Sequence, residues 1–246
     1  MGGGTLAGNR PVKRLILADI HANLPAFEAV LRDAPAVDEI LFLGDVVGYG
    51  PHPAACVDLL RDLAPIAILG NHDADLLRRA EESEWSDSAH DIWLRWTIDR
   101  LSPEQRAYLQ SLPARLHIRA GTASVTVIHQ TPGRNYLRPT SADTEVAEAL
   151  HGVPGTLVYC GHVHRAMRFH LPGRELVCFP AVGQPRNRDP RAGYAVETDG
   201  HLDFHYVPYD TNATLQALAG IPLPADFADR WSHFVQTGYD AEWSRE

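Results

Sequence analysis

The sequence predicts an α/β fold with two β-sheets, and three observations lead to this expectation. Apolar runs alternate with helical patterns over residues 13–69, an order that favours parallel strands joined by right-handed crossovers. Residues 75–112 contain no strand pattern and predict a helical insertion beside the sheet. From residue 115 to residue 207, short strands follow one another with turns between them, which predicts a second sheet packed on the first.

Each element of the first part has its own pattern. Residues 13–18, 39–43 and 65–69 are short continuous apolar runs, as found in strands that are covered on both faces. Apolar residues at helical spacing predict helices over 24–31 and 54–63. We therefore expect strand, helix, strand, helix and strand in this order.

The helical insertion carries a stripe of tryptophans. Trp85, Trp93 and Trp96 fall on one face of a helical pattern. We interpret this stripe as core packing against the main domain, and a cap that faces the substrate is the alternative. Residues 102–105, Ser-Pro-Glu-Gln, have the form of a capping box with proline at the first helical position, so a further helix is expected to begin there.

The second half of the chain is divided by turns into short elements. Strands are predicted at 115–119, 124–129, 156–160, 166–170, 175–179, 194–197 and 201–207, the first two as a hairpin, and a short helix at 145–150. Two weak helical patterns follow. We therefore divide the chain into a mobile glycine-rich tail at 1–10, one domain at 11–210 that contains the helical insertion, and a C-terminal helical extension at 211–246.

Composition disfavours several classes of protein. The 246 residues and 45% hydrophobic content fit one large globular domain with a sizeable core. The formal net charge of −9 disfavours nucleic acid and anionic membranes as partners, because both are bound chiefly through Lys and Arg. No apolar run approaches the roughly 20 residues of a membrane helix, and no secretory signal is apparent. The 3 cysteines fit reduced thiols in a cytoplasmic protein.

Side chains that bind metal ions gather where the predicted strands end. They are Asp19 and His21 after the first strand, Asp45 after the second, Asn71, His72 and Asp73 after the third, His129 at the end of the hairpin, and His162 and His164 after the strand at 156–160. The carboxyl ends of strands in an open α/β sheet lie along one edge, so these side chains are expected to converge.

The local spacing of these residues favours a built site. Residues i and i+2 of an extended segment point the same way, so Asp19 with His21, and His162 with His164, are each expected to face one place. A glycine precedes the ligand residues in three of the loops, which lets the backbone turn sharply and approach an ion.

The candidate ligands are carboxylates, imidazoles and one carboxamide, with no thiolate. This set suits first-row divalent ions such as Mn, Fe, Co, Ni or Zn and differs from a structural zinc site built of cysteines. Seven ligand residues are too many for one tetrahedral ion, and two ions that share a bridging aspartate account for the number. Two such ions leave a locally cationic pocket that suits a phosphate, and ions roughly 3.5–4 Å apart are suited to displacement at phosphorus.

The order Asp-x-His, Gly-Asp, Gly-Asn-His-Asp, His, Gly-His-x-His, from residue 19 to residue 164, resembles the calcineurin-like metallophosphoesterase superfamily. Residues 43–51, Leu-Gly-Asp-Val-Val-Gly-Tyr-Gly-Pro, and 182–186, Val-Gly-Gln-Pro-Arg, resemble its small single-domain prokaryotic phosphoesterases. The resemblance implies a four-layer sandwich of two mixed β-sheets flanked by helices, with a dinuclear metal site on one edge. It also implies a phosphatase or phosphodiesterase that hydrolyses a phosphate ester by attack of a metal-bound hydroxide.

The resemblance further implies a role for each motif residue. Asp19, His21 and His164 would hold the first ion, Asn71, His129 and His162 the second, and Asp45 would bridge the two. His72 would face the substrate and stabilise the transition state or protonate the leaving oxygen. Asp73 would orient a site histidine, with capping of the following helix as the alternative.

Other positions near the motifs bear on the substrate. Arg186 and Arg134 lie in loops and are candidates for phosphate binding, with solvated surface arginines as the alternative. Protein serine/threonine phosphatases of the superfamily continue the Gly-Asp motif with Asp-Arg-Gly, whereas residues 48–50 here are Gly-Tyr-Gly, which weakens that interpretation. Gln130 follows His129 where a glycine is common.

We therefore expect a cytoplasmic hydrolase with two divalent ions, Mn favoured and Fe, Ni, Zn or Co as alternatives, that acts on a small-molecule phosphoester. Monoesters, phosphodiesters, cyclic nucleotides and dinucleoside polyphosphates all fit the motifs. A non-catalytic scaffold of the same fold and a metal-dependent nuclease are the alternative functions. The net charge of −9 and the lack of a Lys/Arg track argue against the nuclease, and the oligomeric state is left open.

Overall fold

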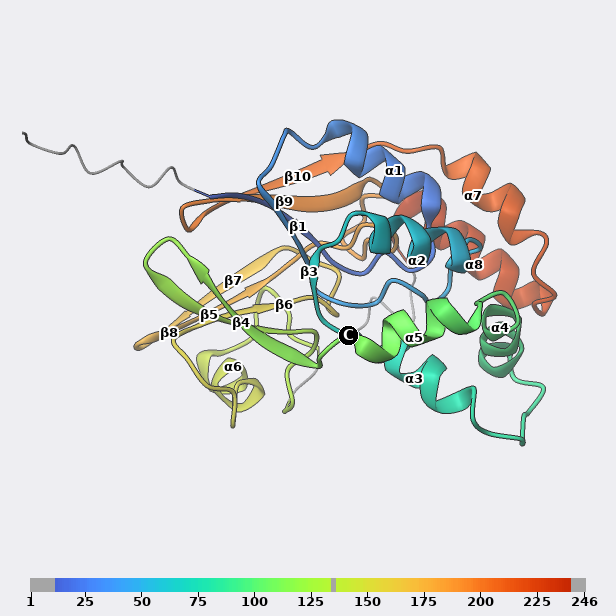
Figure 1. Ribbon diagram of the computed structural model, residues 1–246, viewed down its shortest axis with the longest axis horizontal. Coiled ribbons are helices and arrows are strands. Elements are labelled where there is room, and N and C mark those ends of the chain that lie inside the picture. The colour runs from blue at the N-terminus through green and yellow to red at the C-terminus, as the bar shows by residue number, and fades with distance from the viewer. Residues whose placement is uncertain (1–11, 134–135, 240–246) are drawn as a thin grey trace, which may run out of the picture.

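Two five-stranded β-sheets face each other in the computed structural model, which describes residues 12–133 and 136–239 (Figure 1). The predicted mobile tail at 1–10 lies outside these residues, as does the end of the predicted C-terminal extension. Helices cover the outer faces of the sheets, so the predicted α/β sandwich of two mixed sheets flanked by helices is confirmed.

The first sheet has the strand order β10-β9-β1-β2-β3. Its strands are β1 (Lys13–Leu17), β2 (Glu39–Phe42), β3 (Ile66–Ala67), β9 (Ala192–Thr198) and β10 (His201–Val207). β1, β2 and β3 are parallel, and the helices α1 (Leu24–Asp33) and α2 (Pro53–Asp62) connect them, as the apolar runs predict. β9 runs antiparallel to β1, with Ile16 opposite Ala195.

The second sheet has the strand order β4-β5-β6-β8-β7. Its strands are β4 (Arg115–Ala120), β5 (Ala123–Ile128), β6 (Leu157–Cys160), β7 (Met167–Leu171) and β8 (Arg174–Cys178). β5, β6 and β8 are parallel, and antiparallel pairing adds β4 and β7 at the two edges. The expectation that every strand of the second half joins this sheet is wrong for β9 and β10, which complete the first sheet instead.

Alternating side chains of β1 hold the layers together. Ile16 faces the second sheet and belongs to a buried core that includes Tyr159 of β6 and Phe179, the residue after β8. Leu15 and Leu17 point the opposite way, into the core beneath the helices, because successive side chains of a strand alternate between its faces. β1 is thus covered on both faces, as its continuous apolar run predicts.

Helix α6 (Asp143–Ala149) covers the other side of the sandwich. Figure 1 shows it below the second sheet, on the side away from the first sheet. Val146 and Ala149 pack there against Val158 and Leu176 of the sheet's outer face. The order of layers is therefore helices, first sheet, second sheet and α6.

The predicted insertion consists of helices and contains no strand among its described residues. Its helices are α3 (Asn71–Arg79), α4 (Ala89–Ile98) and α5 (Pro103–Ser111). Trp93 and Trp96 are buried on α4, but Trp85 precedes this helix. The helix begins after Ser88, whose hydroxyl caps it by accepting a hydrogen bond from Asp91 N. The predicted stripe is thus shorter than expected, because a local capping hydrogen bond starts the helix after Trp85.

The C-terminal extension contains α7 (Thr211–Leu218) and α8 (Ala225–Thr237), which pack against each other. Trp231 and Phe234 of α8 are buried in the core beneath the helices. None of the helices within the described residues has the length and apolar character needed to cross a membrane.

Candidate metal centre

Five loops that follow parallel strands meet at one edge of the sandwich. They follow β1, β2 and β3 in the first sheet and β5 and β6 in the second, and they carry the side chains predicted as ligands. Backbone hydrogen bonds join the first two of these loops: Asp19 N donates to Gly44 O (3.0 Å) and His21 N to Asp45 O (3.0 Å). The segment after β8 joins them, since Gly183 N donates to Asp19 O (2.9 Å). The structure thereby brings residues that are far apart in the sequence to one place.

The backbone at the candidate ligands is left-handed and not extended. The φ angle is 54° at Asp19, 48° at His21, 62° at Asp45, 66° at His162 and 58° at His164. The predicted convergence of i and i+2 side chains through extended geometry is therefore wrong, because a sharp turn at each of these residues directs its side chain. Non-glycine residues rarely adopt this conformation, and strain of this kind is concentrated at functional sites.

Two glycines leave the space that this arrangement needs. Gly44 has a φ of +96°, and a Cβ atom at Gly70 would lie 2.0 Å from Asp45 Oδ1. A larger residue at position 70 would therefore displace the Asp45 carboxylate. The close backbone approach expected at these glycines is present.

The first group of candidate ligands consists of Asp19, His21 and His164, which are all buried. His164 Nε2 lies 3.3 Å from Asp19 Oδ1 and 3.1 Å from His21 Nε2, and His21 Nε2 lies 3.8 Å from Asp19 Oδ1. Two ligand atoms that are each roughly 2.0–2.2 Å from one ion lie roughly 3–3.6 Å from each other. The separations around His164 fit a shared cation.

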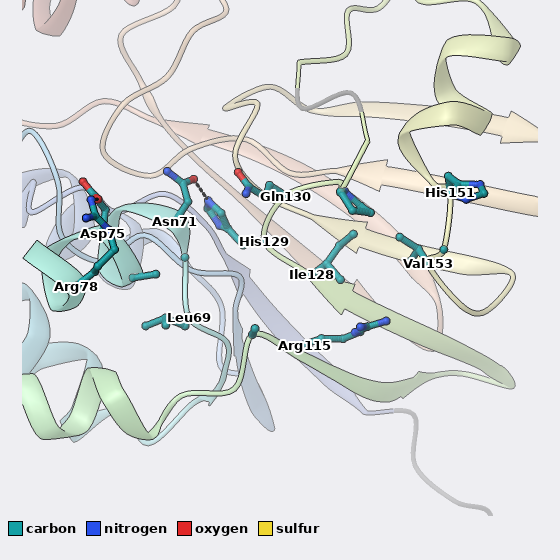
Figure 2. A pocket seen from close by; sticks show the side chains of 15 residues that line it. Leu69, Asn71, Asp75, Arg78, Arg115, Ile128, His129, Gln130, His151 and Val153 are labelled. Carbon is teal, nitrogen blue, oxygen red and sulfur yellow. Dashed lines mark hydrogen bonds and ion pairs between the residues drawn. The ribbon is translucent and has the colours of Figure 1, made fainter.

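The second group combines Asp45, Asn71, His129 and His162. His129 Nε2 lies 3.1 Å from Asp45 Oδ2 and 2.9 Å from Asn71 Oδ1, a contact drawn in Figure 2. Asn71 Oδ1 in turn lies 2.8 Å from His162 Nδ1. Asp45 Oδ2 is also 3.9 Å from His21 Nε2 of the first group. This oxygen therefore lies between the two groups, where a bridging ligand has to be.

Hydrogen bonds fix which nitrogen of two histidines faces the first group. His21 Nδ1 lies 3.2 Å from Val47 O, and His164 Nδ1 lies 2.5 Å from Gln184 O. A carbonyl oxygen only accepts, so each Nδ1 carries the proton and each neutral ring turns the lone pair of Nε2 inward. Two lone pairs 3.1 Å apart repel each other, and a cation between them removes the repulsion.

Burial sets the protonation of the first group. Burial is the largest cause of the lowered pKa of both histidines, and it brings the pKa of His21 well below its ordinary value. Burial opposes the ionisation of Asp19, but His164, and after it His129 and His21, bring the pKa of Asp19 down to about 2. One carboxylate and two neutral imidazoles are deprotonated donors, the form in which side chains bind metal ions.

The carboxylates in and beside the second group stabilise positive charge there. Burial opposes the ionisation of Asp45, yet His129 and then His72 hold the pKa of Asp45 well below its ordinary value. Burial also disfavours a charged His129, but Asp45 and then Asp19 raise the pKa of His129 to about 10. Buried carboxylates require a nearby positive charge, which either a proton on His129 or a metal ion supplies.

Two buried polar atoms of the second group have no hydrogen-bond partner within the described part of the chain. They are His162 Nε2 and Asp45 Oδ2, the latter apart from its ion pair with His129. Asp45 Oδ2 is the one that faces the other candidate ligands, because His162 contacts Asn71 through Nδ1 and its Nε2 points to another side of the ring. Burial and then His129 lower the pKa of His162 to about 3, so its ring is neutral. Buried polar atoms without partners are rare in proteins, and a bound ion is one of their ordinary explanations. The residues present therefore fit a metal ion.

His72 and Asp73 take different positions. The ring of His72 is half-buried and lies edge-on to His21, with 5.2 Å between centroids, and burial, partly offset by Asp45, lowers the pKa of His72. Asp73 Oδ2 accepts from Asp45 N (2.9 Å) and Gly70 N (3.1 Å), and Oδ1 accepts from Val47 N (3.0 Å). Asp73 thus caps α3 and holds the Asp45 loop, and no hydrogen bond joins it to a described histidine.

An aromatic cluster lies beside His72, and the sequence analysis did not predict it. The Tyr49 ring lies 4.6 Å from His72 between centroids. Trp93 of α4 stacks on Tyr49 at 5.3 Å, and Trp231 of α8 lies 5.2 Å from it. The helical insertion and the C-terminal extension therefore both reach the site through Tyr49. The sequence offered one indication of this cluster, which is that residues 48–50 are Gly-Tyr-Gly in place of Asp-Arg-Gly. No local pattern indicates that Trp231 packs there.

The two predicted phosphate-binding arginines have different outcomes. Arg186 is only 8% exposed, donates to Gln184 Oε1 (3.1 Å) and acts electrostatically on His72 and His164. It lies within the site, so the alternative of a solvated surface arginine does not describe it. Arg134 lies outside the described residues.

Comparison with known proteins identifies the family. Residues 12–200 match the calcineurin-like phosphoesterase superfamily domain. The chain therefore belongs to the calcineurin-like phosphoesterase superfamily, as the order of its motifs predicts.

Similar proteins match along different lengths of the chain. The structure of a metallophosphoesterase from Sphaerobacter thermophilus is similar, with 33% identity and a TM-score of 0.77, over 94% of this chain and 100% of that one. An uncharacterized protein of Methanocaldococcus jannaschii is 29% identical over 238 residues, 87% of this chain and 95% of that protein. A symmetrical bis(5'-nucleosyl)-tetraphosphatase of Acidovorax ebreus is 31% identical over 123 residues, 46% of this chain and 42% of that protein.

Proposed function

We propose that this protein is a metal-dependent phosphoesterase with a dinuclear site. The observation that carries the proposal is the position of Asp45 Oδ2, 3.9 Å from His21 Nε2 in the first group and 3.1 Å from His129 Nε2 in the second. Membership of the calcineurin-like phosphoesterase superfamily supports the same activity.

In this proposal each group holds one ion and Asp45 belongs to both. The ligands are Asp19, His21 and His164 for one ion, Asn71, His129 and His162 for the other, and Asp45 as the bridge. Two bound divalent ions would activate water as the nucleophile and neutralise phosphoryl oxygens. Oxygen and nitrogen ligands without thiolate suit Mn, and Fe, Ni, Zn and Co remain alternatives.

Arg186 and His72 would act on the substrate directly. Arg186 is buried and donates a hydrogen bond to Gln184, so its side chain is already ordered. It would bind the phosphoryl oxygens with little further loss of side-chain entropy. His72 would stabilise the transition state or give a proton to the leaving oxygen. Its position is well defined, since its backbone N–H donates to Asp45 Oδ1 (2.8 Å) and Tyr49 packs against its ring.

We infer that the substrate is a small-molecule phosphoester and that the protein acts in the cytoplasm. The net charge of −9 opposes nucleic acid as the substrate. One similar protein carries the name bis(5'-nucleosyl)-tetraphosphatase, so dinucleoside polyphosphates belong among the candidates with monoesters, phosphodiesters and cyclic nucleotides. The three cysteines are free and buried, which fits a reducing compartment.

Metal analysis combined with a substrate panel tests the proposal. Protein loaded with Mn²⁺ should contain about two ions per chain, as a dinuclear site requires. The panel contains p-nitrophenyl phosphate, bis(p-nitrophenyl) phosphate, a cyclic nucleotide and diadenosine tetraphosphate, each assayed with Mn, Ni, Fe and Zn. At least one ester should be hydrolysed. A metal content near zero would reject the site, and two ions without turnover of any ester would favour a scaffold.

A further inference from the structure

A pocket of about 740 Å³ begins at the candidate metal centre. Two of the candidate ligands, Asn71 and His129, line it. Figure 2 shows these two side chains between Asp75 and Arg78 on one side and His151 and Val153 on the other. Pockets that bind small molecules have volumes of roughly 300–1,000 Å³, so this one has room for a group much larger than a phosphate.

The walls of the pocket are mixed in character. Leu69, Ile128 and Val153 supply apolar surface, and Gln130 and His151 supply polar groups. A purely hydrocarbon ligand would leave the polar groups without partners, whereas a small inorganic ion would leave the apolar walls in contact with water. An organic group with polar substituents fits the lining.

The two arginines of the pocket differ in how their charge is used. Arg78 forms ion pairs with Asp75 (2.5 Å) and with Glu82, so its charge is already balanced. Arg115 also lines the pocket, and Figure 2 shows its side chain below Ile128 with the guanidinium directed toward the Val153 side. No hydrogen bond or ion pair joins the Arg115 side chain to any residue that the structure describes. Arg115 is therefore a cation available to a ligand in the pocket.

We propose that the pocket binds the organic part of the phosphoester and that Arg115 recognises a second anionic group on that part, such as a further phosphate. The proposal rests on the proposed function and specifies its substrate class. The scissile phosphate lies at the metal centre, and the organic group extends from Asn71 and His129 toward Val153. A guanidinium binds a phosphate through charge-assisted hydrogen bonds, which makes the second anion a selective feature.

Two chromogenic esters that differ only in that second anion test the proposal. They are thymidine 5'-(p-nitrophenyl phosphate) and the same ester with a phosphate on its 3'-oxygen, and both release p-nitrophenolate. In the Mn²⁺-loaded protein the 3'-phosphorylated ester should have a KM at least about tenfold lower. Arg115→Ala should abolish this difference, and Arg115→Lys should retain part of it. Equal KM values in the unmodified protein, or a preference that survives in Arg115→Ala, would overturn the proposal.

A matched control and a binding measurement separate this proposal from the proposed function. Arg119→Ala removes another exposed arginine of β4, at the end of the strand away from the pocket, and should keep the preference. Titration calorimetry measures the binding of thymidine 3',5'-bisphosphate to the Mn²⁺-loaded protein and to Arg115→Ala. Weaker binding by Arg115→Ala without hydrolysis of any ester would support the pocket and reject the phosphoesterase. Hydrolysis of both esters with no effect of Arg115→Ala would do the reverse.

Discussion

At the scale of single residues, Asp45 is held by contacts from several segments. One of its oxygens accepts from His72 N (2.8 Å), while the other lies between the two groups of candidate ligands. Its loop is held in turn by Asp73, which accepts from Asp45 N and Val47 N. The backbone around the Asp45 carboxylate therefore sets its position.

Asp45→Asn should lose at least one metal ion per chain and reduce kcat/KM by about 100-fold or more, because the neutral amide cannot bridge two cations. Metal content by mass spectrometry and hydrolysis of the best ester from the panel are the two measurements. Asp203→Asn, an exposed substitution on β10, is the control and should change neither value. Full metal content together with full activity in Asp45→Asn would contradict the bridging assignment.

His72→Ala should keep both ions and still lose about 10²- to 10⁴-fold in kcat, which is the usual effect of losing a general acid. The expected pattern is thus the opposite of that for a ligand. An unchanged kcat would show that the leaving oxygen takes its proton from elsewhere. Loss of the ions would show that His72 belongs to the metal site itself.

At the residue scale, the sequence identified the type and order of the site side chains but not their geometry. The motifs named all seven candidate ligands, and the structure brings them together, while metal binding by them stays a prediction. The left-handed backbone at Asp19 and His164 was not foreseen, because aspartate and histidine signal such a conformation far less strongly than glycine does. The burial of Arg186 could not be foreseen either, because it depends on segments far away in the chain.

At the scale of elements, the C-terminal helix α8 is connected to the site through aromatic rings in contact. Trp231 packs against Tyr49, and Tyr49 packs against His72. We therefore expect a change in α8 to alter how firmly the His72 ring is held.

Trp231→Ala should lower the free energy of unfolding by about 3–5 kcal/mol, as for other buried tryptophans, and should also lower kcat. Trp231→Phe keeps an aromatic ring and should recover most of both. Denaturant unfolding and steady-state kinetics measure the two effects. Gln236→Ala, an exposed substitution on the same helix, is the control. A normal kcat in folded Trp231→Ala would disprove the influence of α8 on the site.

Helices and strands were predicted best where a short stretch of sequence alone determines the element. The apolar runs at β1 and β2 and the hairpin of β4 and β5 follow from local sequence. The sheet that β9 and β10 join does not, because strand pairing is decided by contacts between distant segments. The start of α4 after Trp85 was missed because the Ser88 cap outweighs the helical spacing of the tryptophans.

At the scale of the whole molecule, the candidate metal centre joins the two sheets. Asp19 and Asp45 come from the first sheet, and His129 and His162 come from the second. A cation held by both sets of residues would link the two halves of the sandwich, and binding of an ion to the folded state alone raises its stability.

Mn²⁺ should therefore raise the melting temperature, and removal of metal by EDTA should lower it. At a free ion concentration about 100 times the Kd, one site contributes about 2.7 kcal/mol, which corresponds to roughly 5–10 °C for a protein of this size. Differential scanning calorimetry of the metal-free and Mn²⁺-loaded protein measures the shift. Asp45→Asn should show a smaller shift, and equal shifts in both proteins would locate the stabilising ion elsewhere.

The pairing of β1 with β9 has a consequence for synthesis on the ribosome. Ile16 lies opposite Ala195, so one side of β1 has no partner until roughly 180 further residues have been translated. At roughly 5–20 residues per second this takes on the order of 10–40 s. An apolar strand with a free edge is prone to pair with other chains during such an interval. We therefore expect the nascent chain to gain from a chaperone that covers this edge until β9 has been synthesised.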